Sequence, residues 1–136
     1  MTVFQSFAAS DNFRLARSKS LYDLDDDTYD LIMIPKFAFV NQVWLYITQA
    51  YAGGASGTIT VGFKGNGESE DAVAFMNTTV AAGRAAGMKI ASDDTEAASN
   101  GKWFTDASGF ITITLSHGTD TTLFRGYVIA QYSVLH

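Results

Sequence analysis

Residues 43–48 read Val-Trp-Leu-Tyr-Ile-Thr, a run of large side chains in which every second one is aliphatic. Successive side chains of a β-strand point to opposite faces, so this run predicts a strand with two different faces. The row expected to enter a core consists of Val43, Leu45 and Ile47. The row on the opposite face consists of Trp44, Tyr46 and Thr48.

The same alternation returns further along the chain. Residues 58–63 read Thr-Ile-Thr-Val-Gly-Phe, and residues 110–115 read Phe-Ile-Thr-Ile-Thr-Leu. In both runs the apolar row is predicted to face inward and the threonines outward. The run 123–135 alternates over a greater length and indicates a structural C-terminal strand. Residues 29–34 predict another strand, which ends at Pro35 because proline has no N–H to donate to a sheet.

Weaker strand signals lie at 71–75 and 87–91, and the alanine-rich segment 78–86 predicts a single helical turn. Gly65-Asn66-Gly67 predicts a hairpin, because Asn and Gly tolerate positive φ. The whole pattern predicts an all-β fold, a jelly-roll-like antiparallel β-sandwich of about eight strands. An immunoglobulin-like sandwich is the alternative, since it shares these local signals. We place the sandwich at residues 28–136 and an N-terminal arm or edge segment at 1–27.

The composition limits the functions open to the chain. Its 136 residues suffice for one domain with its own core. The absence of cysteine excludes disulfides, thiolate metal sites and cysteine nucleophiles. The net charge of −5 argues against nucleic-acid binding, which depends on basic residues. No apolar run is long enough to span a membrane, and the N-terminus lacks the pattern of a secretion signal.

Candidate catalytic groups are sparse. His117 lies in a predicted turn and His136 is the last residue, and neither has a nucleophile or metal ligand at a diagnostic spacing. Carboxylates cluster at 23–30, 68–71 and 93–96, but none of these clusters matches a calcium-loop pattern, so we interpret them as solvated loop charges. The sequence predicts no catalytic, cofactor-binding or metal-binding residue. A carboxylate-based hydrolase is the least favoured function.

A short basic segment, formed by Arg14, Arg17 and Lys19, precedes the first acidic cluster. Nucleic-acid binding would require more positive charge interleaved with aromatic rings, and Phe13 alone does not supply it. A positive segment beside a negative loop is better suited to pairing with the same elements on a neighbouring copy. Exposed ion pairs contribute only about 0–1 kcal/mol each, so they would set register more than affinity.

The order of features from Tyr29 onward is distinctive. An acidic approach leads into the strand that ends at Pro35, and the 43–48 and 58–63 strands follow. Residues 103–109, Trp-Phe-Thr-Asp-Ala-Ser-Gly, precede the 110–115 strand and the long terminal strand. This order resembles small structural proteins of tailed bacteriophages, of the capsid decoration or cement type. The resemblance covers residues 28–135 and rests on pattern and order.

The resemblance implies a β-sandwich without catalytic residues that stabilises a phage head by bridging neighbouring capsid subunits. It implies partners in the major capsid protein and in further copies of this chain, often as a trimer, with no nucleic acid and no membrane. The location implied is the virion surface, after synthesis in the host cytoplasm. The candidate interface residues are Phe4, Phe7, Phe13, Arg14, Arg17, Trp44, Tyr46 and Trp103. The alternative function is a carbohydrate-binding or adsorption module of a phage tail or fibre, in which outward aromatic rings stack on sugars.

Overall fold

The computed structural model describes residues 13–77 and 85–135. Within these ranges the regular structure consists of ten β-strands and a short 3-10 helix. The strands are β1 (Phe13–Arg17), β2 (Leu21–Tyr22), β3 (Asp27–Ile34), β4 (Ala38–Gln49), β5 (Thr58–Gly65), β6 (Glu68–Asn77), β7 (Gly87–Ile90), β8 (Lys102–Phe104), β9 (Gly109–Ser116) and β10 (Arg125–Val134). The 3-10 helix, η2, is Ala91–Asp93. In these ranges there is no helix with the length and apolarity that crossing a membrane requires.

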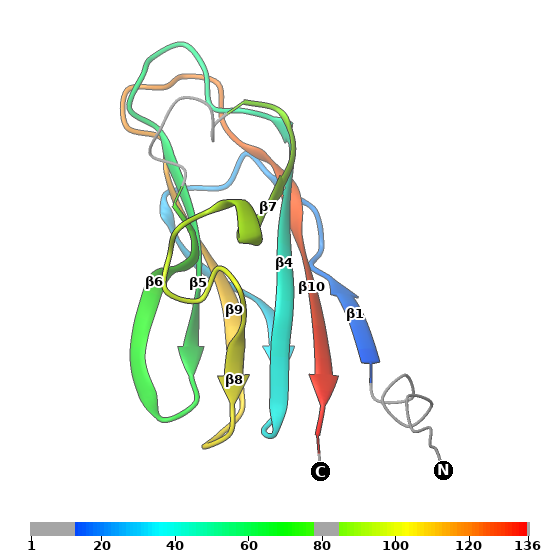
Figure 1. Cartoon of the computed structure of the whole chain (residues 1–136). Helices are drawn as coiled ribbons and strands as arrows, with labels where there is room; N and C mark the ends of the chain where they lie inside the picture. The colour runs from blue at the N-terminus through cyan, green and yellow to red at the C-terminus, as the bar shows by residue number, and fades with distance from the viewer. Residues whose placement is uncertain (1–12, 78–84, 136) are drawn as a thin grey trace, which may run out of the picture.

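The strands form two antiparallel sheets that face each other (Figure 1). In the six-stranded sheet the order is β1-β10-β4-β7, with β2 added to β10 and β8 added to β4. In the four-stranded sheet the order is β3-β9-β5-β6. The predicted all-β antiparallel sandwich is confirmed. The sequence pattern identified no strand at β1, β2 or β8, which span 5, 2 and 3 residues, too few for alternation to reveal them.

The alternating rows identified in the sequence form the core between the sheets. Val43, Leu45 and Ile47 of β4 are fully buried on the inner side of the six-stranded sheet. The four-stranded sheet contributes the fully buried Ile59, Val61, Ile111 and Ile113. Burying a side chain of this size contributes about 1.5–3 kcal/mol, so these rows supply much of the folding free energy.

One outward position departs from the predicted pattern. The threonines of β9 are expected to face solvent, but Thr112 has no exposed surface, and its hydroxyl has no hydrogen-bond partner among the described residues. Thr112 pairs with Gly62, and a Cβ added to Gly62 would lie 1.9 Å from the carbonyl oxygen of Asp71. The register of β5 and β6 shifts on both sides of Phe63. We infer that β6 bulges over the outer side of the sheet here and covers Thr112.

The turns follow the local sequence. Asn66 and Gly67 join β5 to β6 with φ angles of 58° and 69°, which confirms the predicted hairpin. At the opposite end of the sandwich, the buried carboxylate of Asp120 accepts hydrogen bonds from the N–H groups of Gly54 (2.8 Å) and Gly57 (2.7 Å). This side chain therefore joins the β4–β5 loop to the β9–β10 loop.

Three further segments singled out in the sequence can be compared with the structure, which describes two of them only in part. The helical turn expected at 78–86 falls largely outside the described residues. The stretch 93–101, which begins with the third carboxylate cluster, contains buried Ala98, whose N–H donates to the carbonyl of Ala74 on β6 (2.7 Å). Of the N-terminal segment 1–27, β1 and β2 both pair with β10, and residues 1–12 lie outside the described ranges.

Candidate interaction surface

The outer side of the six-stranded sheet carries a row of large apolar side chains. In β4, Trp44 and Tyr46 alternate with the core residues and so point away from the core. On one side of β4, the antiparallel register places Ile129 and Tyr127 of β10 beside Trp44 and Tyr46, respectively. On the other side it places Ile90 and Met88 of β7 beside the same two residues. Leu15 of β1, 71% exposed, extends the row to the sheet edge. The outer apolar face, as we call it, consists of Leu15, Trp44, Tyr46, Met88, Ile90, Tyr127 and Ile129.

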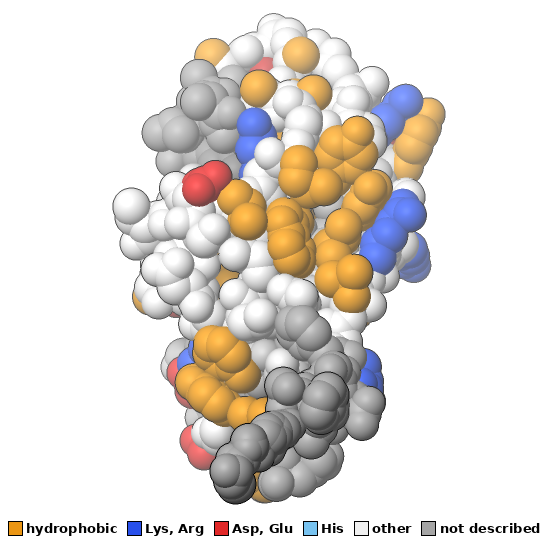
Figure 2. Space-filling model, turned by 45° about the vertical axis from the view of Figure 1, so that its right-hand side comes forward, with side chains coloured by type: hydrophobic (Ala, Val, Ile, Leu, Met, Phe, Trp, Pro, Cys, Tyr) orange, Lys and Arg blue, Asp and Glu red, His pale blue; other side chains and the backbone are white. Residues whose placement is uncertain are grey.

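A cation lies across one margin of the outer apolar face. The guanidinium carbon of Arg17 lies 3.8 Å from the centre of the Tyr127 ring, and that ring meets Tyr46 edge to face at 5.3 Å. Such cation–π contacts contribute about 0.5–1 kcal/mol at exposed sites. Figure 2 shows hydrophobic side chains gathered on this side of the molecule, with Lys and Arg side chains at the margin. The surface is thus apolar in its centre and positive at its edge.

A second aromatic pair lies at the other end of the same sheet. Trp103 of β8 pairs in register with Phe39 of β4, and their ring centres are 4.6 Å apart. The indole is 49% exposed. Burying a partly exposed Trp against a partner protein is a common source of binding energy, so this pair is a second candidate contact.

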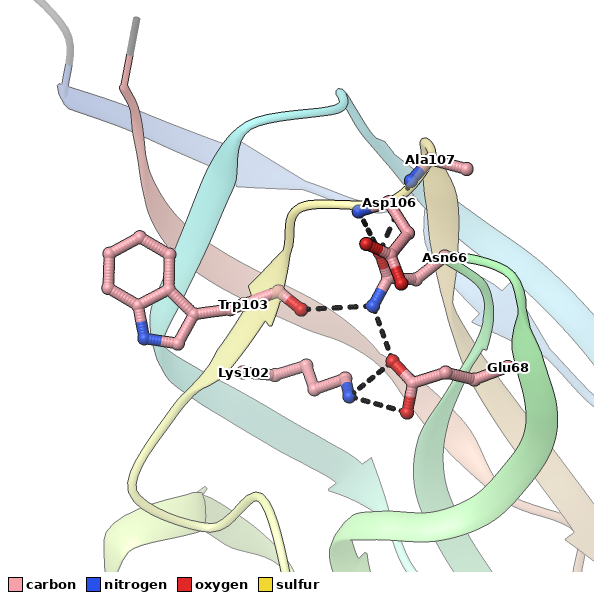
Figure 3. A network of polar contacts seen from close by, with 6 residues as sticks. All are labelled: Asn66, Glu68, Lys102, Trp103, Asp106 and Ala107. Carbon is pink, nitrogen blue, oxygen red and sulfur yellow. Dashed lines mark hydrogen bonds and ion pairs between the residues drawn. The ribbon is translucent and has the colours of Figure 1, made fainter.

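A buried amide holds the strand that carries Trp103 (Figure 3). The Asn66 side-chain N–H₂ donates to the backbone carbonyl of Trp103 (3.2 Å) and to the carboxylate of Glu68. Its side-chain oxygen accepts from the N–H groups of Asp106 (2.9 Å) and Ala107 (3.3 Å). Asn66 thereby connects the β5–β6 turn of one sheet to β8 of the other.

An ion pair extends this network. Lys102 donates to both oxygens of Glu68, at 2.7 and 2.9 Å, and lies 4.5 Å from the centre of the Phe63 ring. The hydrogen bonds from Lys102 and then Asn66 lower the pKa of the Glu68 carboxyl below its usual value. The charged form of Glu68 therefore stabilises the fold above its ordinary pKa, and this contribution is lost as the pH falls through the lowered value.

We expect Asn66→Ala to destabilise the protein by about 2–4 kcal/mol. The substitution removes the acceptor of two N–H groups and the donor to the Trp103 carbonyl. It also places alanine at a positive φ, which alanine tolerates less well than asparagine or glycine. Chemical denaturation measures the loss. Asn66→Gly is the matched control, since it relieves the backbone and removes only the side-chain bonds. A variant Asn66→Ala that unfolds at the wild-type denaturant midpoint would show that the network contributes nothing.

The structure places the sequence-selected candidates in different surroundings. Arg17, Trp44 and Tyr46 come together on the outer apolar face, while Trp103 lies apart beside Phe39. Arg14 pairs in register with Tyr132. Its side chain lies on the opposite side of β1 from those of Leu15 and Arg17, because neighbouring side chains of a strand alternate. Phe4 and Phe7 lie outside the described residues, and of Phe13 only the backbone, in β1, is described.

Sequence reasoning missed several members of the outer apolar face as contact candidates, namely Leu15, Met88, Ile90 and Ile129. The alternation of residues 123–135 places Ile129 in the same row as Tyr127, and this row could have identified Ile129 as a contact candidate. Leu15 and Met88 lie in strands of 5 and 4 residues, where alternation is too brief to identify a face. Their grouping depends on strand neighbours that no local pattern specifies.

The titratable groups form pairs rather than larger clusters. His117 Nδ1 lies 2.8 Å from the carboxylate of Asp26, and the His117 side-chain bond lowers the pKa of Asp26. The hydrogen bond from Arg125 likewise lowers the pKa of Asp23. In the ranges 13–77 and 85–135, no three His, Cys, Asp or Glu side chains are placed to hold a metal ion. His136 lies outside these ranges.

Comparison with known proteins identifies the fold. No protein-family model and no curated protein sequence matches the chain. A chain of the acidic stable capsid structure of Helicobacter pylori bacteriophage KHP30 is similar with a TM-score of 0.65 and 14% identity, covering 90% of this chain and 87% of that one. A chain of the cyanophage Pam1 capsid asymmetric unit is similar with a TM-score of 0.62 and 15% identity, covering 91% and 86%. This chain shares the fold of those capsid chains.

Proposed function

We propose that this chain is a structural protein of a bacteriophage virion, and that it acts as a decoration or cement protein. In this role it stabilises the head shell by bridging neighbouring capsid subunits. The observation that carries the proposal is the outer apolar face, a contiguous surface of exposed and half-exposed apolar side chains on a fold shared with chains of two phage capsid structures. Contiguous exposed apolar patches mark protein interaction sites.

The strand order supports a jelly roll within this proposal. Eight of the described strands form two four-stranded layers, β1-β10-β4-β7 and β3-β9-β5-β6, and among consecutive described strands only β5 and β6 pair directly. The chain therefore crosses repeatedly from one layer to the other, as in two nested Greek keys. Jelly rolls of eight strands recur in viral capsid and lectin domains.

The aromatic packing favours a protein partner over a sugar. The Tyr46 and Tyr127 rings meet at an interplanar angle of 75°, and Phe39 and Trp103 at 40°. A sugar-binding platform needs an aromatic plane open to the ligand, whereas these rings are turned against one another. Rings packed in this way still offer apolar area to a complementary protein surface.

Stabilisation of the shell follows from mass action. A protein that binds assembled subunits but not free ones adds its binding free energy to the assembled state. A standard interface buries about 1,600 Å² in total, and contacts made by one body to two subunits reinforce each other through effective concentration. A rigid sandwich with an apolar outer face is suited to this role because little conformational entropy is lost on binding.

The test is co-sedimentation of the purified chain with heads of the phage whose genome encodes it. We expect saturable binding by the wild-type chain. Trp44→Ala combined with Met88→Asp is expected to weaken binding at least about tenfold, or about 1.4 kcal/mol, since it removes apolar area and adds a charge to the face. Both side chains lie on the outer side, away from the core.

Met33→Asp is the matched control, because Met33 is an exposed apolar residue, at 62%, on the four-stranded sheet. It is expected to bind heads as the wild type does. Thermal unfolding of each variant establishes that it is folded. Absence of binding by the wild-type chain would overturn the proposed function, and equal binding by both variants would overturn the assignment of the face.

A further inference from the structure

Two edges of the sandwich carry opposite charge. The basic edge is β1 with the residue pair beyond it, and it carries Arg14, Arg17 and Lys19. The acidic edge is the first part of β6, and it carries Glu68, Glu70 and Asp71. β1 and β6 lie at opposite lateral margins of the molecule (Figure 1). The chain thus presents a short positive strand on one side and a short negative strand on the other.

Both edges are open to a further strand. Among the described residues, β1 has a strand neighbour only in β10, and β6 only in β5. The second half of β6 is covered, because Ala98 bonds the carbonyl of Ala74 and the carboxylate of Asp94 accepts from the Asn77 N–H. The stretch Glu68–Asp71 has no strand placed against its outer side. An open edge presents backbone N–H and C=O groups that can pair with another strand.

Charge determines which edges can meet. Two β1 edges would bring arginines together, and two β6 edges would bring carboxylates together, so both like pairings are disfavoured. A β1 edge against a β6 edge pairs opposite charges and satisfies backbone groups on both strands. We propose that copies of this chain associate side by side, with the β1 edge of one copy against the Glu68–Asp71 edge of the next. This inference deepens the proposed function, on which it rests, by naming how copies contact one another on the shell.

The contacts within one copy leave charge available at both edges. Arg17 donates to the hydroxyl of Ser20 (3.0 Å) and stacks on Tyr127, and both partners are neutral. Lys19 is exposed. On the acidic side Lys102 is bound to Glu68, whereas Glu70, two residues further along β6, is exposed, and its cationic neighbour Lys64 is itself paired with Asp30. Opposite charges at such edges accelerate association and set register more than they add affinity.

The pairing is heterologous, since two different edges meet. Head-to-tail contacts of this kind form closed rings when the rotation between copies closes, and trimers belong to this class. Each copy in a ring keeps its outer apolar face uncovered, because the edges and not the face make the contact. A ring therefore presents several faces together, and simultaneous binding raises avidity over that of one copy.

The test measures the mass of the purified full chain by analytical ultracentrifugation over a range of protein and salt concentrations. The wild type is expected to form oligomers that dissociate as NaCl rises from about 50 mM to about 500 mM. Arg17→Glu with Lys19→Glu sets two carboxylates against Arg14 and so makes both edges acidic, and Glu70→Lys with Asp71→Lys sets two lysines against Glu68 and so makes both edges basic. Each double variant alone is expected to raise the dissociation constant at least about tenfold. An equimolar mixture of the two is expected to assemble again, because acidic and basic edges then alternate.

Lys36→Glu and Asp25→Lys are matched controls, since each reverses an exposed charge outside β1 and β6. They are expected to assemble as the wild type does. A strictly monomeric wild type, double variants that assemble normally, or two folded variants that fail to assemble when mixed would each overturn the inference. A monomer that still co-sediments with heads would overturn the edge pairing and leave the proposed function intact. Salt-sensitive oligomers that have no affinity for heads would overturn the proposed function and leave the edge pairing intact.

Discussion

A chain that ends at Tyr127 is expected not to fold. β10 lies between β1 and β4 in the six-stranded sheet, so deletion of Val128–His136 removes every β10 partner of β1 and most of those of β4. It also removes Val128 and Ala130, which are fully buried. Each lost backbone hydrogen bond costs about 1 kcal/mol and the lost valine about 2 kcal/mol. Their sum reaches the total stability of about 5–15 kcal/mol that is usual for a domain.

Far-UV circular dichroism and thermal unfolding measure this effect. The truncated chain is expected to show no cooperative transition. A chain that lacks only Leu135 and His136 is the control, because β10 ends at Val134 and, among the described residues, this deletion removes the backbone bond from the Leu135 N–H to the Phe37 carbonyl. A soluble chain of residues 1–127 that melts cooperatively would show that β10 is dispensable.

Gly62→Ala is expected to destabilise the protein by about 3 kcal/mol, at the upper end of the usual cost of overpacking. The new Cβ would lie 1.9 Å from the carbonyl oxygen of Asp71 and 2.5 Å from the carbonyl carbon of Ala72. These are backbone atoms of β6, so no side-chain rotation can relieve the contact. The bulge of β6 that covers Thr112 must move away from the sheet.

Equilibrium unfolding in urea measures the change at Gly62. Thr60→Ala is the matched control, since Thr60 is half-exposed on the same side of β5 and its truncation is expected to cost less than about 1 kcal/mol. If Gly62→Ala unfolds within about 0.5 kcal/mol of the wild type, the close approach of β6 to β5 is absent in solution.

β4 carries a core row and an outer row on a single strand. Val43, Leu45 and Ile47 lie in the core, while Trp44 and Tyr46 lie on the outer apolar face. Substitutions in the first row are expected to act on folding, and under the proposed function substitutions in the second row are expected to act on contacts with other proteins. The two rows can therefore be tested independently, because neighbouring side chains of a strand point to opposite sides.

Strand alternation in the sequence alone determined which side chains of the main strands face the core. The runs 43–48, 58–63 and 110–115 each place their apolar row in the core, and Pro35 lies directly after the last residue of β3. The two-residue hairpin at Asn66 and Gly67 was also accessible, since these residues tolerate positive φ. These features depend on a few neighbouring residues and on covalent geometry, so a single sequence contains them.

The neighbours of each strand were decided only by the tertiary structure. Leu15, Tyr46, Met88 and Ile129 come from four strands that are distant in sequence, and only the order β1-β10-β4-β7 places them on one face. The burial of Thr112 under β6 and the separation of the charged edges at β1 and β6 have the same origin. Strand pairing minimises a free energy summed over the whole chain, and alternation of one strand holds no information about its partner.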